Sequence, residues 1–437
     1  MSNSAGPLLA RLASLFKTEP IVIRTCGWVG WAVVAAIGLA CGKTDKPLFT
    51  LPGFKSDPAP PGPLQGLFLT TNNGSDLLSA VDPVTRVVKW SIPLGFNPVE
   101  LEGPHHITAD PAGQFVYVNL SEAVVGSGGG PHGAHGTGTI PGFVLKIRTS
   151  DGTLAAFAQV DPNPGDLVSA PDGKTLFVTH YDLLKLGKGV QAGDLRQGDS
   201  NLAVIDTATM TVTKKVPICP ASHGTRLSAD ARTLYATCLT DEIAVVDVSN
   251  PALPVQRVLL PNQTETPTCN RCPYALGVGT DGAVWVSSLG AGGGTTGGGG
   301  VDVYDPVANK FDPARSISLC GRALFASFAP APGSAPGYLV YVPEQGCGNT
   351  ATRDAVRVYK SGGPGQAPPP AGQILFTHAD CFNAHILNLS SDGKTGYLVC
   401  EGDHIGPGSF AFLDLQALTT TSSVPLAVFP DGMAFIP

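Results

Sequence analysis

Histidines and cysteines are the residues of this sequence that could carry chemistry, and two segments combine them with identical spacing. Residues 219–238 and 381–400 each begin and end with cysteine, and each has a histidine four positions after the first cysteine, His223 and His385. Regularly spaced cysteines form disulfides in oxidising compartments, and histidine is a common metal ligand. The repeated spacing indicates that one structural unit occurs at least twice in the chain.

Short apolar strands followed by turns recur along the chain, and these elements must position the histidines and cysteines. Copies such as LSAVDPVT, LAVIDTAT, IAVVDVSN, VDVYDPVA and FAFLDLQA occur, with weaker copies at 143–152 and 355–363. Upstream of most copies a turn precedes an alternating strand, as in APDGKTLFVTH and SSDGKTGYLVC. Units of four strands that repeat about every 40–45 residues, apart from insertions, are typical of β-propeller blades. The 54 glycines and 39 prolines also favour a turn-rich, all-β fold.

The repeats resemble those of the YVTN family of β-propellers, and FVYVNL and TLFVTH are close to its signature. The resemblance spans residues 64–437 and implies a β-propeller, a fold that in similar proteins often serves as a binding scaffold. The five clear and two weaker copies of the strand-and-turn motif predict seven four-stranded blades. GLFLTTN at the start of this region resembles a second strand, and FPDGMAFIP at its end resembles a first strand. We expect these two strands to pair and complete one blade, because closure removes open sheet edges.

Eight cysteines fall within the predicted propeller, and an even number favours disulfides over metal ligands. In the expected antiparallel pairing, the two cysteines of each repeated segment are neighbours near the bridging Cα separation of about 5.5 Å. The predicted pairs are Cys219–Cys238, Cys381–Cys400, Cys320–Cys347 and Cys269–Cys272. The last pair forms a Cys-x-x-Cys that could instead be redox-active, although no βαβ pattern surrounds it.

Long insertions and all the histidines are expected on one face of the propeller. The insertions lie between second and third strands, whose loops open on the same face as the loops that join blades. Insertions confined to one face indicate a binding surface. The insertions are residues 121–141, 182–199, 289–300, 344–354 and 401–409. The histidines are His105, His106, His132, His135, His180, His223, His378, His385 and His404.

Alignment of the blades on the aspartate before each second strand, such as Asp110, predicts the histidine registers. His223 and His385 then share one register, at the mouth of the central channel. The other residues in this register are Gly103, Gly165, Tyr274 and Asp431. His105 and His106 fall two and three positions further along the first strand.

Strand alternation predicts that only one of the adjacent histidines His105 and His106 faces the channel, since successive residues point to opposite sides. We expect this to be His106, whose register holds Arg226 and Asn388. We expect His105 to pack between blades, because its register holds Leu167, Leu276 and Leu387. The candidates for ligand binding are His106, His223, His385, Arg226, Asn388, Tyr274 and Asp431.

A metal site at the channel mouth is one hypothesis for the histidines, and ordinary polar loop residues are the other. Imidazoles with nearby carboxylates suit Zn, Cu or Fe. The possible ligands are His105, His106, His223, His385 and His404. A metal site requires that these side chains converge within one pocket.

The N-terminal region, residues 1–40, is expected to be a signal peptide. After Arg24 the sequence TCGWVGWAVVAAIGLACG contains no charge, and it resembles a bacterial lipoprotein signal with Cys41 as the lipidated first residue. Leu39 departs from the usual pattern, because it lies two residues before the cysteine and not three. A single-pass anchor over residues 25–42 is the alternative. Residues 41–63 form a Pro-rich tether, so we predict a periplasmic, outer-membrane or cell-surface protein attached to the membrane.

Composition and missing motifs limit the possible functions. A net charge of −7 without a basic stripe argues against nucleic-acid binding. The glycine runs lack the Lys-Ser/Thr of a phosphate loop, and the sequence has no Gly-x-Ser-x-Gly and no Cys-x-x-Cys-His. We therefore predict a binding propeller for an unknown ligand or protein partner. The alternative is a metal-dependent enzyme, either a lactonase-like hydrolase or an oxidoreductase, which are classes seen on similar propellers.

Overall fold

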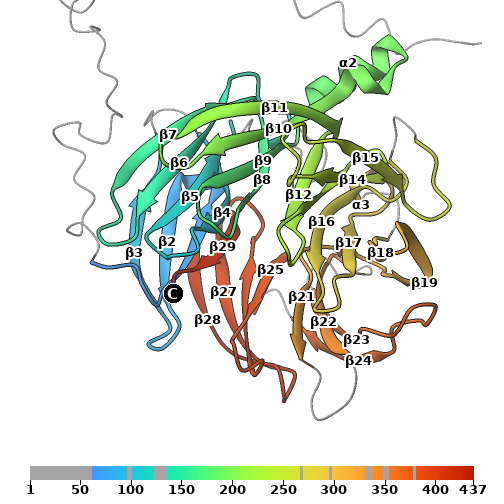
Figure 1. Ribbon diagram of the computed structural model, residues 1–437. Coiled ribbons are helices and arrows are strands. Elements are labelled where there is room, and N and C mark those ends of the chain that lie inside the picture. The colour runs from blue at the N-terminus through green and yellow to red at the C-terminus, as the bar shows by residue number, and fades with distance from the viewer. Residues whose placement is uncertain are drawn as a thin grey trace, which may run out of the picture. The chain divides into compact units, whose positions relative to one another are not determined.

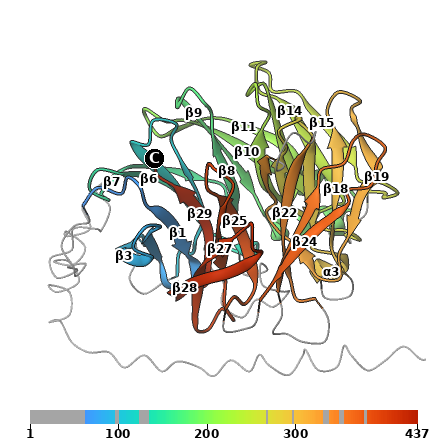
Figure 2. The same cartoon turned by 90° about the horizontal axis from the view of Figure 1, so that it is seen from below.

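Seven antiparallel sheets form a ring of blades in the computed structural model of the chain. The structure describes residues 62–95, 101–122, 135–265, 269–294, 298–330, 337–347, 354–376 and 380–437. Figure 1 shows the blades following one another from blue to red, and Figure 2 shows them from below. The predicted all-β, seven-bladed propeller is confirmed.

In each of blades 1 to 4 the strands are named in order from the innermost to the outermost. Blade 1 contains β29 (Pro430–Phe435), β1 (Phe68–Asn72), β2 (Leu77–Asp82) and β3 (Val87–Pro93). Blade 2 contains β4 (Pro104–Ala109), β5 (Phe115–Leu120), β6 (Gly142–Arg148) and β7 (Leu154–Val160). Blade 3 contains β8 (Pro164–Ser169), β9 (Thr175–His180), β10 (Asp199–Asp206) and β11 (Thr211–Pro220). Blade 4 contains β12 (Ser222–Leu227), β13 (Thr233–Cys238), β14 (Glu242–Asp247) and β15 (Val255–Leu259).

The remaining blades follow the same pattern, with one irregular inner strand. Blade 5 contains β16 (Pro273–Val278), β17 (Val284–Ser288), β18 (Gly300–Asp305) and β19 (Lys310–Ser318). In blade 6 the inner strand is divided into β20 (Arg322–Ala323) and β21 (Ser327–Pro330), followed by β22 (Tyr338–Gln345), β23 (Ala355–Lys360) and β24 (Pro370–Leu375). Blade 7 contains β25 (Ala384–Leu389), β26 (Thr395–Cys400), β27 (Pro407–Asp414) and β28 (Thr419–Val428). Short helices lie in loops: η2 (Asn73–Ser75), α2 (Leu183–Ala192), η4 (Leu195–Gly198) and α3 (Ala291–Gly294).

The ring closes by pairing the end of the propeller with its beginning, as predicted. Strand β29 pairs antiparallel with β1, with Phe68 opposite Phe435. The N–H of Ile436 donates to the carbonyl of Leu67 at 3.0 Å. Blade 1 is therefore built from both ends of the propeller, which protects its inner edge.

The hydrophobic core lies between neighbouring blades. Inner strands such as β4 and β12 are buried over their first four residues, because neighbouring blades cover both of their faces. Outer strands such as β28 alternate exposed and half-buried residues, as expected for a strand with one solvated face. Leu69 of β1, Ala434 of β29 and Val118 of β5 belong to one apolar cluster that joins blades 1 and 2.

Four disulfides have the predicted pairings. The Cα–Cα separations are 5.7 Å for Cys219–Cys238, 5.3 Å for Cys381–Cys400, 5.1 Å for Cys320–Cys347 and 4.9 Å for Cys269–Cys272. The first of these bonds joins the outer strand of blade 3 to the second strand of blade 4, because β11 runs into the inner strand of the next blade. It therefore connects two blades.

The predicted signal peptide, Cys41 and most of the tether lie outside the described residues, so they stay predictions. Among the helices of the described ranges, none is long and apolar enough to cross a membrane.

Candidate metal centre

Five buried histidines gather where the inner strands begin, at the centre of the ring. His105 and His106 come from β4, His223 from β12 and His385 from β25, while His135 comes from the loop between β5 and β6. None of these residues is more than 2% exposed. The ring centroids of His105 lie 4.4 Å from His106, 4.3 Å from His135 and 5.1 Å from His223. The structure therefore brings together histidines from three blades and one insertion.

The register of His105 differs from the prediction. His105, His223 and His385 are each the second residue of an innermost strand, a position that also holds Gly165, Tyr274 and Asp431. Gly103 precedes β4 and does not share this register. The reason is the turn of blade 2, in which Asp110 occupies the place of Ala170: Gly113 donates to the carbonyl of Asp110, as Gly173 does to that of Ala170. The aspartate thus stands two positions earlier in this turn than in blade 3.

His106 is also in a different register from the one predicted. Its true register holds Asp166, Gly224, Ala275 and Ile386. The leucines Leu167, Leu276 and Leu387 align with Ile107, and Arg226 and Asn388 align with Thr108.

A β-bulge directs both adjacent histidines toward the cluster, so the expectation that His105 would pack between blades is wrong. Pro104 pairs with Leu120 and Ile107 pairs with Val118, which leaves two histidines opposite the single residue Asn119. The extra residue breaks the alternation of the strand. The side-chain oxygen of Asn119 accepts the backbone N–H of His106 at 2.5 Å, so this N–H has a hydrogen-bond partner within the bulge.

Backbone carbonyls orient the three histidines of the shared register. Nδ1 of His223 lies 3.1 Å from the carbonyl oxygen of Tyr274, and Nδ1 of His385 lies 3.1 Å from that of Asp431. Nδ1 of His105 lies 3.5 Å from the carbonyl oxygen of Pro164. A carbonyl only accepts, so Nδ1 carries the proton in each ring. Metal-ligating histidines are commonly held in this way. Burial opposes the charged form of His385, but the neighbouring carboxylate of Asp431 outweighs it and raises the pKa of His385 to about 9.

Asp431 supplies a negative charge within the cluster. Its Oδ2 lies 3.1 Å from Nε2 of His105 and 3.8 Å from Nε2 of His135, and its Oδ1 lies 2.8 Å from Nδ1 of His385. Burial opposes ionisation, but the histidine charges outweigh it and hold the pKa of Asp431 well below its usual value. The groups that face its two oxygens among the described residues are the imidazole nitrogens of these histidines, none of which makes a well-aligned hydrogen bond in this geometry. A buried carboxylate needs a positive charge nearby, from a protonated imidazole or from a bound metal ion.

His106 is neutral, and one of its two ring nitrogens is buried without a hydrogen-bond partner among the described residues. Burial, followed by the proximity of His105, lowers the pKa of His106 to about 3. Its Nε2 has no hydrogen-bond partner among the described residues. A neutral imidazole with an available lone pair is the form that ligates metals.

Ligand atoms close enough to share a metal ion fall into two sets that both contain His105. One set is His105, His106 and His223, and the other is His105, His135 and Asp431; the atoms of each set lie within 4.8 Å of one another. A third set, Cys320, Glu344 and Cys347, contains a disulfide, so its sulfurs are not free to ligate. The first set has the chemistry of a three-histidine metal site.

The other predicted ligands lie beside these sets. The ring of His385 is 6.0 Å from that of His106. His404, in the loop after β26, places Nε2 2.6 Å from Oε2 of the buried Glu401 and stacks on Phe429. His180 instead places Nδ1 2.7 Å from the carbonyl oxygen of Asn201. His132 and His378 lie outside the described residues.

Aromatic and charged residues surround the histidines. Tyr274 stacks on His223 with ring centroids 3.7 Å apart, and burial raises its pKa well above the usual value. The ring of Phe325 lies 5.0 Å from the ring of His106, and the guanidinium of Arg226 lies over the Phe325 ring at 5.2 Å. Arg226 binds Asp166 at 2.6 Å. Asn388 is half-buried on β25 and belongs to neither ligand set.

Sequence reasoning missed Asp166 and Phe325. Nδ1 of His106 lies 3.8 Å from Oδ1 of Asp166. Alignment of the blades on Gly113 and Gly173 would have placed Asp166 in the register of His106. No sequence signal indicates Phe325, because it lies in the irregular part of blade 6 between β20 and β21.

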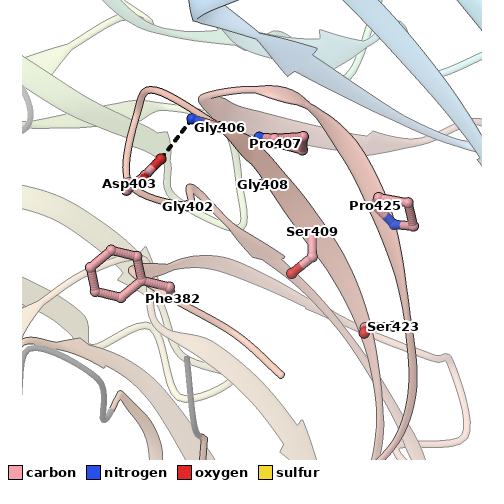
Figure 3. A pocket seen from close by; sticks show the side chains of 9 residues that line it. All are labelled: Phe382, Gly402, Asp403, Gly406, Pro407, Gly408, Ser409, Ser423 and Pro425. Atoms are coloured by element: carbon pink, nitrogen blue, oxygen red, sulfur yellow. Dashed lines mark hydrogen bonds between the residues drawn. The ribbon is translucent and has the colours of Figure 1, made fainter. Parts of the chain in front are cut away.

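A surface pocket of about 460 Å³ lies next to the loop of blade 7 that carries His404. Figure 3 shows Asp403 at one edge of the pocket, where its side chain accepts the N–H of Gly406 at 2.7 Å, with Phe382 nearby. Of the histidines that the structure describes, none lines this pocket. The pocket is therefore separate from the candidate metal centre.

Comparisons with known proteins agree with the fold. No protein-family model matches the chain, and no curated protein matches it by sequence. Hydrazine synthase from Kuenenia stuttgartiensis is 14% identical and has a TM-score of 0.53, with 77% of this chain and 91% of that chain covered. A functionally unknown protein from Desulfotomaculum acetoxidans is 10% identical with a TM-score of 0.59, over 85% and 98%. The dihydro-heme d1 dehydrogenase NirN in complex with DHE is 14% identical with a TM-score of 0.52, over 90% and 79%.

These similarities concern the fold alone, because every identity is below 15%. The resemblance to the YVTN repeats stays a prediction. The function of this chain is therefore inferred from the residues of its own candidate site.

Proposed function

We propose that this propeller is a metal-binding protein that holds a transition-metal ion at the start of its inner strands. The observation that carries the proposal is the convergence of His105, His106 and His223, whose ligand atoms lie within 4.8 Å of one another in a fully buried position. Side-chain adjustments of less than 1 Å or so would bring such atoms to the separation set by metal–nitrogen bonds of about 2.0–2.1 Å.

The surroundings of the site indicate which ions it would take. Imidazole ligands with a nearby carboxylate suit Zn, Cu or Fe and are poor ligands for Mg or Ca. Carbonyl contacts at Nδ1 of His105 and His223 direct Nε2 toward the ion. Because the three ligand residues are at most 2% exposed, the geometry favours ion binding over access of a large organic substrate.

We further propose that the protein is exported and attached to the membrane through Cys41, and that the face with the insertions binds a ligand or protein partner. Four disulfides support an oxidising compartment. His135 and His404 come from two of these insertions, which supports a metal centre next to the proposed binding surface.

Metal analysis of the purified full-length protein tests the proposal. Protein freed of metal by a chelator and then dialysed against zinc or copper should retain the ion, as measured by plasma mass spectrometry. His106→Leu and His223→Asn should each weaken binding by at least about tenfold, since each removes one ligand. His180→Asn is the matched control, because it changes a buried histidine outside both ligand sets. Wild-type protein that retains neither ion would contradict the proposal.

A further inference from the structure

We propose that the histidine cluster is a two-ion centre, with a second metal position formed by His135 and Asp431 on the other side of His105. This inference rests on the proposed function and concerns the same buried cluster. The second ligand set, His105, His135 and Asp431, combines two imidazoles with one carboxylate. Such a set also suits a divalent transition metal.

Bond lengths determine whether one ion could bind all five residues. An ion with bonds of about 2.0–2.2 Å contacts two ligand atoms that are at most about 4.4 Å apart. The ligand atoms of the five residues do not all lie within 4.8 Å of one another but fall into two sets that do. At least one ligand atom of one set is therefore more than 4.8 Å from an atom of the other set. One ion therefore cannot contact all five ligands in this geometry. His105 belongs to both sets, which puts the two positions next to each other.

The distances around Asp431 match those between two ligands of one ion. Its Oδ2 is 3.1 Å from Nε2 of His105 and 3.8 Å from Nε2 of His135. The side-chain amide of Asn73, 3.1 Å from Nδ1 of His135, holds that ring so that Nε2 faces Asp431. Among the residues that the structure describes, imidazole nitrogens face both carboxylate oxygens without a well-aligned hydrogen bond. A cation at this position would satisfy the buried charge.

The charge of the cluster also favours a second cation. Asp431 forms ion pairs with His105, His135 and His385. Glu401, fully buried, adds a second carboxylate 4.0 Å from Nε2 of His385. Two carboxylates offset part of the charge of two divalent ions, which lie about 3.5–4 Å apart in two-metal sites. The single lone pair on Nε2 of His105 binds one ion, so solvent completes the coordination of the other.

The stoichiometry of metal binding tests this inference with the full-length protein. Metal-free protein is saturated with zinc, separated from free ion by gel filtration, and analysed by plasma mass spectrometry. We expect two ions per wild-type chain, and one per chain for Asp431→Asn and for His135→Asn. His223→Asn, which alters the other ligand set, should also bind one ion, and His180→Asn should bind two. Electron paramagnetic resonance of the copper-loaded protein should show coupling between neighbouring ions in the wild type and isolated copper in the Asp431 and His135 variants.

The possible outcomes separate the two proposals. One ion per saturated wild-type chain, or a copper signal without coupling, overturns the second position and leaves the proposed function intact. No retained ion overturns both. Because Asp431 lies on the closing strand β29, its variant is checked by thermal melting, and His135→Asn, in a loop, provides an independent test. Two ions that both variants retain would also overturn the assignment of these ligands.

Discussion

Single residues in the candidate centre are in states that a stable core normally avoids. His106 is buried with a pKa lowered to about 3 by burial, and its Nε2 has no hydrogen-bond partner among the described residues. An unsatisfied buried polar group destabilises a fold by about 1–3 kcal/mol. Such costs concentrate at functional sites, where ligand binding compensates for them.

Replacing His106 should separate stability from metal binding. His106→Leu removes a buried, unsatisfied polar atom beside Phe325, so the metal-free variant should unfold with a free energy about 1 kcal/mol higher than wild type. The same variant should lose the stabilisation that zinc gives to the wild type. Denaturant titrations with and without zinc measure both effects. A metal-free variant that is less stable than wild type would show that His106 has a structural role.

His180 should make the stability of the propeller depend on pH outside the candidate metal centre. Burial lowers the pKa of His180 to about 4, against 6.5 in the unfolded chain. Between these values the unfolded chain binds more protons, so stability is complete above pH 6.5 and falls as the pH drops toward 4, by about 3 kcal/mol in total. The variant His180→Asn keeps a donor for the carbonyl of Asn201 and should show a flatter dependence. Urea titrations at several pH values from 4 to 7 give the free energy of unfolding of both proteins. If this free energy changes equally with pH in the two proteins, the assignment to His180 is contradicted.

At the scale of elements, junctions between blades position the site. The bulge in β4 turns both His105 and His106 toward the cluster, and β11 continues directly into the inner strand that carries His223. Other junctions are fixed by carboxylates in loops. Asp241, in the loop after β13, accepts the backbone N–H groups of Asn270, Arg271 and Cys272 at the entry to blade 5.

The disulfide between blades 3 and 4 should contribute more stability than the Cys-x-x-Cys bond. Cys219–Cys238 closes a loop with a sequence separation of 19, whereas Cys269–Cys272 has a separation of 3. The entropy removed from the unfolded chain grows with loop length, and a loop of about this size gives roughly 3 kcal/mol. The double change Cys219→Ala and Cys238→Ala should therefore lower the free energy of unfolding by about 3 kcal/mol. The matched change of Cys269 and Cys272 should cost clearly less, and equal losses in denaturant titrations would contradict the argument.

At the scale of the whole molecule, closure and the metal centre depend on the same strand. Strand β29 pairs with β1 to complete blade 1, and it also carries Asp431 into the cluster. The protein therefore cannot open its ring at this blade without losing a charge from the centre.

Deleting residues 430–437 should destabilise the propeller strongly. The deletion exposes the inner edge of β1 and the apolar surface that Met433 and Ile436 cover, and buried side chains of this kind contribute about 1.5–3 kcal/mol each. We expect a clear fall in the melting temperature, measured by circular dichroism. A truncation that removes only Pro437 is the control, because it leaves β29 intact. Unchanged melting of the longer deletion would contradict the closure.

The sequence by itself determined the local and repeated features of this protein. Strand and turn patterns predicted seven blades, the two unpaired ends predicted closure, and equal cysteine spacing predicted the disulfides, because each depends on local periodicity or on pairing of neighbouring strands. The shared register of His223, His385, Tyr274 and Asp431 followed from the same repeat.

Only the tertiary structure decided how the histidines meet. The register of His105 depends on a turn in which Asp110 stands two positions early, and its direction depends on a bulge that breaks strand alternation. His135 reaches the cluster from an insertion, whose path no periodicity describes. Residues from blades far apart in sequence become neighbours only when the ring closes, since the packing of whole blades sets their distances. The two overlapping ligand sets around His105 are therefore a property of the closed propeller.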